Sequence, residues 1–323
     1  NGLTNLCLSG GRLLKPLVFQ SKPVLTHLTF LDLSSLTVTF ESIVSVFDAF
    51  KNGVLSVDGL DLSSLHFVDV DDRKRFYSKI ESLTVDNLKT LVFNENMMDD
   101  SETRSFSIFV SNMSKSLTHL FVDNSIDASQ SGESVLAFLE CVQKIENLAS
   151  LSIRADKSEN FSFGTILAKS LNSILLKKSL KFVDITCQYI SDDGLKTIKT
   201  VVESENSPLE EVLFDGSHPN SVDSLFELCW AVIDSKLKYA SFPSIDFNDE
   251  IEKVKNNEEL YSSLKNTESQ IQARFAIRFK KKEKKEQIWM RQISEVRPVT
   301  HSTSKSSINE SLAPGLNNFS FAP

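Results

Sequence analysis

Apolar side chains recur along the chain in a short alternating pattern, Leu-x-x-Leu-x-Leu, as in Leu28–Leu33. The pattern returns nine times, and its second apolar position is occupied by Leu6, Leu31, Leu60, Leu91, Leu120, Leu151, Val183, Val212 and Ala240. These positions are about 25 to 32 residues apart, with a mean of about 29. Alternation with a period of two indicates short β-strands. A fixed spacing of this length indicates a repeat architecture.

Between the strand segments, the apolar positions change to the helical period of 3.6. One helical face comprises Phe40, Ile43, Val44, Phe47 and Phe50. Comparable faces lie within residues 135–142, 166–175 and 225–232. Each unit is therefore predicted to contain a strand, a turn and a helix. Because one unit cannot bury its apolar face alone, neighbouring units must stack. We predict an α/β solenoid with parallel strands on its concave face and helices on its convex face.

The most regular copy runs Leu180-x-x-Val183-x-Ile185-x-x-Gln188-x-Ile190-x-x-x-Gly194-Leu195-x-x-Ile198. This copy resembles the leucine-rich repeat superfamily, in particular its ribonuclease-inhibitor-like class, and the resemblance covers about residues 3 to 250. It implies a solenoid of about nine repeats with an asparagine ladder that joins them. Among the residues that close the strands, only Asn96 is an asparagine, so we expect that ladder to be mostly absent.

The predicted organisation has four parts. Residues 1–248 form the solenoid, which begins directly at a strand, so we expect a missing N-terminal cap and a chain that is a fragment. Residues 249–264 are predicted to form a C-terminal capping helix. Residues 265–297 are predicted to form a basic helical extension, and residues 298–323 to form a disordered tail.

Charge is distributed unevenly over the 323 residues, which carry 35 Lys and Arg against 43 Asp and Glu, a net charge of −8. Residues 274–297 hold nine basic and three acidic side chains, whereas residues 1–273 sum to −14. Three interpretations of the basic extension remain open: a solvated helix, a contact with an anionic membrane or an acidic partner, and a helix that self-associates. The residues expected to contact an anionic partner are Lys280, Lys281, Lys282, Lys284 and Lys285.

Motifs of the common enzyme and metal sites are missing from the sequence. It contains no Gly-rich phosphate loop, no GxSxG elbow and no HExxH helix, so we predict a protein that is not an enzyme and needs no cofactor. His27 and His119 occupy strand segments, where we expect them to face solvent. The cysteines form no CxxC pair; we interpret them as small hydrophobic residues of a protein from a reducing compartment, the cytoplasm.

The repeat pattern also predicts a surface. Residues that flank the buried leucines of each strand point away from the core, and we expect them to face water on the concave face. Exposed aromatic side chains flanked by charge are typical of protein-binding hot spots. The predicted partner-binding residues are Phe30, Asp32, Asp61, Val92, Phe121, Phe182, Asp184, Leu213 and Tyr239. Acidic side chains outnumber basic ones there, which argues against nucleic acid and favours a protein with a basic or mixed surface.

The expected function is that of a non-catalytic intracellular scaffold for protein interactions. The order of repeats, helical extension and polar tail is similar to that of CARMIL proteins, which implies a cytoskeletal, actin-regulatory role. The alternative is a GTPase activator that resembles the Ran GTPase-activating proteins. Those offer an arginine near their first repeats, and Arg12 follows the first strand here. Weak membrane contact through the basic extension and self-association are further expectations.

Overall fold

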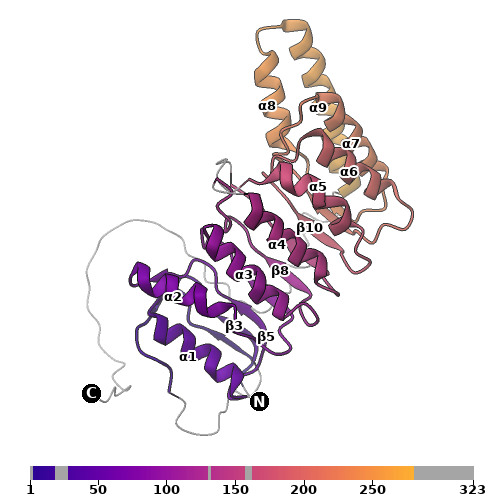
Figure 1. Ribbon diagram of the computed structural model, residues 1–323. Helices are drawn as coiled ribbons and strands as arrows, with labels where there is room; N and C mark the ends of the chain where they lie inside the picture. Colours follow the sequence, from indigo (N-terminus) through magenta and orange to yellow (C-terminus); the bar gives the residue numbers. More distant parts are fainter. Residues whose placement is uncertain (1–2, 19–27, 130–131, 157–161, 280–323) are drawn as a thin grey trace, which may run out of the picture.

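The structure is a computed structural model that describes residues 3–18, 28–129, 132–156 and 162–279 (Figure 1). Three predictions fall outside these residues. They concern the five lysines between positions 280 and 285, the tail 298–323, and the exposure of His27.

Nine short strands form one parallel sheet in which strand order follows chain order. They are β1 (Asn5–Cys7), β3 (Leu28–Asp32), β5 (Val57–Asp61), β7 (Thr90–Val92), β8 (His119–Phe121), β9 (Ser150–Ser152), β10 (Phe182–Asp184), β11 (Glu211–Leu213) and β12 (Tyr239–Ala240). A second parallel sheet of three strands comprises β2 (Arg12–Leu13), β4 (Thr37–Val38) and β6 (His66–Phe67).

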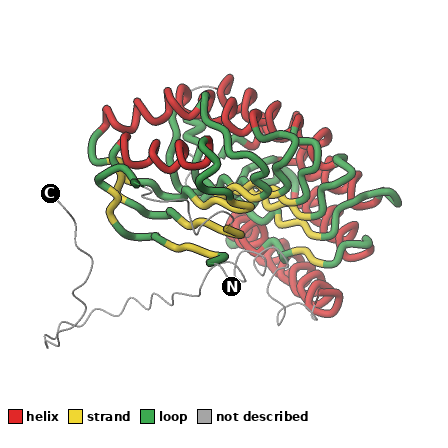
Figure 2. The backbone as a smooth tube through the Cα atoms, turned by 90° about the horizontal axis from the view of Figure 1, so that it is seen from below, coloured by secondary structure: helices red, strands yellow, loops and turns green. Residues whose placement is uncertain are grey.

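Helices alternate with the strands of the main sheet and cover one side of it (Figures 1 and 2). They are α1 (Phe40–Lys51), α2 (Val70–Ile80), α3 (Asp100–Asn112), α4 (Gly132–Lys144), α5 (Gly164–Leu175), α6 (Ser191–Glu203) and α7 (Val222–Asp234). Two more helices, α8 (Ser244–Val254) and α9 (Glu258–Phe279), follow the last strand. The predicted leucine-rich repeat solenoid, with parallel strands on one face and helices on the other, is confirmed.

The register of the sheet stacks the predicted repeat positions on one another. Leu60 pairs with Leu91, Leu91 with Leu120, and Leu120 with Leu151. These four side chains are fully buried between the strands and the helices. Because side chains alternate across a strand, one apolar position in two is enough to build a continuous core.

Asparagine stands at the strand-closing position only at Asn96, as expected, but other polar side chains at that position also join neighbouring repeats. Buried Asn96 accepts a hydrogen bond from the Leu65 N–H (3.1 Å) and donates one to the Leu62 carbonyl (3.0 Å). In later repeats, Gln188 donates to the Ile153 carbonyl and accepts from the Phe163 N–H, and Ser125 donates to the Phe93 carbonyl. Serine and glutamine side chains can therefore replace asparagine at this position, because the buried backbone N–H and carbonyl groups of the turn need only a hydrogen-bond partner.

The sequence predicted a single capping helix over residues 249–264. The structure instead has the end of α8 and the start of α9 in this segment. Asn257 separates them: its side-chain oxygen accepts a hydrogen bond from the Leu260 N–H (3.1 Å), which starts α9. Helix α9 continues past position 265 and packs against α7 and β12 through Ile271, Phe275 and Phe279.

Candidate functional site: the concave face

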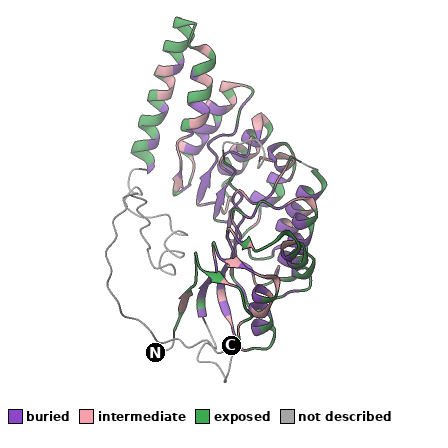
Figure 3. Cartoon of the chain, turned by 90° about the vertical axis from the view of Figure 1, so that its left-hand side faces the viewer, coloured by how far each residue is buried: buried purple, intermediate pink, exposed green. Residues whose placement is uncertain are grey.

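We call the side of the nine-stranded sheet that points away from helices α1–α7 the concave face (Figure 3). Two rows of paired residues cross it. The first row is Asn5, Phe30, Gly59, Thr90, His119, Ser150, Phe182, Glu211 and Tyr239. The second row is Cys7, Asp32, Asp61, Val92, Phe121, Ser152, Asp184 and Leu213. Every predicted partner-binding residue of the repeats therefore lies in one of two adjacent rows.

The expectation that these apolar side chains face water is wrong. They are buried and form a second hydrophobic cluster, separate from the core, against which Tyr239 packs. Phe121 is only 2% exposed and Leu213 only 7% exposed. We call this the concave cluster; its members are Phe30, Val92, Phe121, Phe182 and Leu213.

Part of this burial results from large residues that lie beside small ones on the neighbouring strands. The Phe30 ring covers Gly59, where a Cβ atom would come within 2.4 Å of the Phe30 Cδ2. Strand β9 lies between β8 and β10 and carries only Ser150 and Ser152 on this face. These small side chains leave room for Phe121 and Phe182 to belong to one cluster.

The acidic residues of the second row each have a structural role at the end of a strand. One carboxylate oxygen of Asp32, Asp61 and Asp184 accepts a hydrogen bond from the N–H two residues later, at 2.9, 2.9 and 3.0 Å. Such an Asx turn fixes the chain as it leaves the sheet. The recurring Asp-x-Ser or Asp-x-Thr sequence could have revealed this role. All three residues are at most 5% exposed.

Two buried carboxyl groups lie near each other at the middle of the concave face. Asp123 follows β8 and accepts hydrogen bonds from the Arg154 N–H (2.9 Å) and the Ser152 hydroxyl. Burial raises the pKa of Asp123. Burial and the charge of Asp123 together raise the pKa of Asp184 to about 6. A cation brought to this region would favour the ionised forms.

The sequence predicted that His119 faces solvent, but it is only partly exposed in the first row of the concave face. It is half-buried, and its Nδ1 lies 2.9 Å from the Ser150 hydroxyl. Burial lowers the pKa of His119, so the ring is neutral at pH 7. Arg12, considered for a GTPase-activating role, lies on β2 in the three-stranded sheet and outside both rows.

The described residues contain no group of three or more His, Cys, Asp or Glu side chains that could hold a metal ion. Cys141, Cys187 and Cys229 are buried, whereas Cys7 is exposed, which departs from the expectation of four small hydrophobic residues. None of the described helices is long and apolar enough to cross a bilayer.

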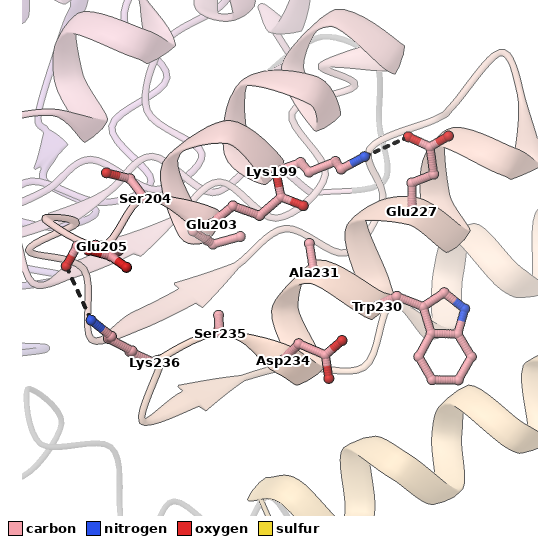
Figure 4. A pocket seen from close by; sticks show the side chains of 11 residues that line it. Lys199, Glu203, Ser204, Glu205, Glu227, Trp230, Ala231, Asp234, Ser235 and Lys236 are labelled. Atoms are coloured by element: carbon pink, nitrogen blue, oxygen red, sulfur yellow. Dashed lines mark hydrogen bonds and ion pairs between the residues drawn. The ribbon is translucent and has the colours of Figure 1, made fainter.

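A hollow of about 490 Å³ lies between α6 and α7, on the helical side of the molecule (Figure 4). The Lys199 Nζ lies 2.9 Å from a Glu227 carboxylate oxygen, and Lys236 donates to the Glu205 carbonyl (3.4 Å). The side chain of Trp230 is 39% exposed at the rim. Because these charges already pair with groups of the hollow itself, it resembles a solvated groove between two repeats more than a ligand site.

The chain was compared with family models, curated proteins and solved structures. No family model matches the chain, and no curated protein matches it. Among solved structures, the chain is similar to the crystal structure of the leucine-rich repeat-containing protein LegL7 from Legionella pneumophila, with a TM-score of 0.42 and 15% sequence identity. The similarity covers 71% of this chain and 88% of that one.

Proposed function

We propose that this protein is a non-catalytic scaffold that binds a protein partner on its concave face. The observation that carries the proposal is the concave cluster. Its five large apolar side chains stand on the side of the sheet that the helical core does not need, and they come from five different repeats. Large apolar residues placed outside the core and surrounded by charge are typical of binding hot spots.

The acidic side chains around the concave cluster indicate which kind of partner would bind there. Asp32 and Asp61 lie beside it at one end, and Asp184 and Glu211 at the other. A partner that brings basic side chains together with an apolar or aromatic group would complement both features. The same acidic surface would repel the phosphates of nucleic acid.

A site-specific photo-crosslinker tests the proposal without disturbing the buried cluster. Benzoylphenylalanine is introduced into the full chain at Thr90, a half-buried residue of the first row, and in a control chain at Leu136, which is 44% exposed on α4. After irradiation in cell lysate, we expect a reproducible set of proteins bound at Thr90 and absent at Leu136. Proteins bound equally at both positions, or only at Leu136, would contradict a concave binding face.

A narrower proposal is a role in the actin cytoskeleton, in the reducing environment of the cytoplasm. It is supported by the order of repeats, C-terminal helices and polar tail, and by three buried cysteines. Co-sedimentation with actin filaments and pull-down of actin-capping protein test it. Loss of either interaction when Thr90 is replaced by Arg, but not when Leu136 is, would assign it to the concave face.

A further inference from the structure

We propose that the edge of the solenoid at which helices α3, α4 and α5 end is a docking surface for an anionic membrane. We call it the lysine edge. It comprises the three segments that run from the last residue of each helix to the residue before the next strand, 112–118, 144–149 and 175–181. The inference goes beyond the proposed function, because it concerns a surface outside the two rows of the concave face.

The topology places these three segments side by side. Helices α3, α4 and α5 are neighbours that each lead into a strand of one parallel sheet, so their C-terminal ends lie at the same edge (Figure 1). Backbone hydrogen bonds join the segments, since the Glu146 N–H donates to the Ser114 carbonyl (3.0 Å). The Lys181 N–H donates in the same way to the Ala149 carbonyl (2.9 Å). The three segments therefore form one continuous edge.

Positive charge is concentrated on the lysine edge. The three segments hold five lysines and one acidic residue, Glu146, which gives a net charge of +4 in a chain of net charge −8. The lysines are Lys115, Lys144, Lys177, Lys178 and Lys181. All of them are exposed except Lys177, which is half-buried. The lysine edge is therefore a strongly basic patch on an acidic protein.

The patch ends where the neighbouring repeats begin. The corresponding segment before it, residues 80–89, holds one lysine against two acidic side chains. The corresponding segment after it, residues 203–210, holds three glutamates and no basic side chain. The helix dipole favours lysine at a helix C-terminus, but that effect acts at every helix of the solenoid. It does not explain why lysines gather at three adjacent repeats and glutamates at the next.

Three of the five lysines are free to meet an anion from outside. Within the described part of the chain, no hydrogen bond or ion pair involves the side chains of Lys115, Lys144 or Lys178. Exposed lysines elsewhere in the solenoid often have an acidic partner; the Lys89 Nζ, for example, lies 3.1 Å from an Asp58 carboxylate oxygen. The positive charge of the lysine edge is therefore not neutralised by its own surroundings.

The half-buried Lys177 also lacks a counter-charge. Its Nζ donates to the Gln143 carbonyl (2.7 Å) at the end of α4. Burial lowers the pKa of Lys177. A negative charge brought to the edge would favour the protonated form and so raise that pKa. Of the five lysines, only Lys181 has a carboxylate within ion-pair distance in the described structure, that of Glu210 at 3.5 Å.

Two features favour a membrane over an acidic protein as the partner. The lysine edge contains no arginine, the residue that binds carboxylates through two parallel hydrogen bonds, whereas lysine acts as a point charge. In addition, Leu176 lies directly before Lys177 and is 53% exposed. An exposed apolar side chain among lysines is typical of membrane-surface contacts, because the cations meet anionic headgroups while the apolar group enters the acyl boundary.

The test measures binding of the full chain to lipid vesicles by co-sedimentation. The vesicles contain phosphatidylcholine alone, or phosphatidylcholine and phosphatidylserine in equal parts. In the charge-reversed chain, Lys115, Lys144 and Lys178 are each replaced by Glu. These side chains are exposed and make no ion pair in the described structure, so the fold should be unchanged, and equal urea midpoints check this.

A matched control carries the same change of charge at exposed lysines away from the lysine edge. These are Lys15, Lys74 and Lys196. The reference, charge-reversed and control chains all keep the lysines between positions 280 and 285, so any binding by that segment is common to them. A difference between the charge-reversed and control chains therefore reports on the lysine edge.

We expect the charge-reversed chain to bind phosphatidylserine vesicles about 100-fold more weakly than the reference and control chains. Each lysine near an anionic surface contributes about fivefold to binding, so three contribute about 100-fold. Higher salt should weaken the binding, and phosphatidylcholine alone should bind much less. Equal binding by the charge-reversed and reference chains, an equal loss in the control, or no binding of phosphatidylserine vesicles by the reference chain would overturn the proposal.

The apolar residue of the edge distinguishes a membrane from an acidic protein. Leu176→Ser should weaken binding to phosphatidylserine vesicles about fivefold, because about half of a leucine side chain no longer enters the apolar layer. Leu136→Ser is the control, since Leu136 is 44% exposed on α4, and it should bind like the reference chain. Tighter binding of polyglutamate than of vesicles, with no effect of Leu176→Ser on vesicle binding, would assign the lysine edge to an acidic protein and overturn the membrane proposal.

Discussion

The two faces of the nine-stranded sheet are both largely buried, but they are built differently. The row that faces the helices contains leucine in its first six strands, then two valines and an alanine. The rows of the concave face contain mixed residue types, among them aspartate, serine, glycine, histidine and phenylalanine. The repeat pattern thus requires apolar residues on the face toward the helices but allows many residue types on the concave face. We expect function on the concave face.

Exposure alone does not distinguish a core from a binding surface. Leu120 and Phe121 are neighbours on β8, and both are at most 2% exposed. Leu120 is enclosed by strands and helices that the fold requires, whereas Phe121 belongs to a cluster on the opposite face. The two residues should therefore respond differently to truncation, and the following experiments sharpen that difference.

The largest effect is expected on the core face. Leu120→Ala should lower the free energy of unfolding by about 2–5 kcal/mol, because it leaves a cavity among close-packed side chains. Urea denaturation measures it, with the half-buried Thr90→Ala as the control. Since each repeat touches mainly its neighbours, hydrogen exchange should rise most in β7 and β9. A uniform rise over all nine strands would refute a repeat-by-repeat architecture.

An intermediate effect is expected from the polar ladder that joins the repeats. Gln188→Ala should cost about 1–3 kcal/mol, because it leaves the buried Phe163 N–H and Ile153 carbonyl without their partner. The control is Gln270→Ala on the exposed side of α9. Equal urea midpoints for the two variants would mean that the ladder adds nothing to stability.

A pH-dependent effect is expected at the middle of the concave face. The pKa of Asp184 is raised from 3.8 to about 6, so the folded protein binds this proton more tightly than the unfolded chain does. The resulting stability is present below about pH 4 and is lost as the pH rises through about 6. Asp184→Asn keeps the acceptor for the Thr186 N–H and removes the titration. Wild type should therefore lose stability relative to this variant between pH 4 and pH 7, and parallel curves would contradict the raised pKa.

The smallest effect is expected on the helical side. The Arg104 guanidinium lies 3.0 Å from a Glu133 carboxylate oxygen, with both side chains more than half exposed. Arg104→Ala should change the free energy of unfolding by at most about 1 kcal/mol, because water screens such pairs. It should also leave crosslinking at Thr90 unchanged. A change in that crosslinking would extend the binding surface to α3.

The sequence predicted the repeat and its register because both depend on local patterns. A leucine at a fixed position in each strand is sufficient to stack Leu60, Leu91 and Leu120. The sequence also predicted which residues lie on the concave face, since side chains alternate along a strand. Their exposure was not, because it depends on residues about one repeat away, such as Gly59 beside Phe30.

The turns after the strands show a second limit of sequence reasoning. The second residue after each strand's final apolar position has a positive φ in most repeats: 72° at Gly10, 56° at Ser35, 51° at Ser64, 58° at Glu95, 51° at Asn124, 60° at Cys187 and 78° at Gly216. Only two of these residues are glycines, so no regular glycine signal marks the turn. The backbone is held there by hydrogen bonds to the next repeat, such as Ser64 N–H to the Asn94 carbonyl (2.8 Å).

The most direct test of the difference between the two faces compares Phe121→Ala with Phe93→Ala. The core control Phe93 is fully buried and packs against Phe106. For both variants we measure the free energy of unfolding by urea denaturation and the crosslinking of partner protein at Thr90. We expect Phe93→Ala to cost about 3–5 kcal/mol, and Phe121→Ala to cost less but to reduce the crosslinking at Thr90. If Phe121→Ala costs as much as Phe93→Ala and leaves the crosslinking unchanged, the concave cluster is a second core rather than a binding surface.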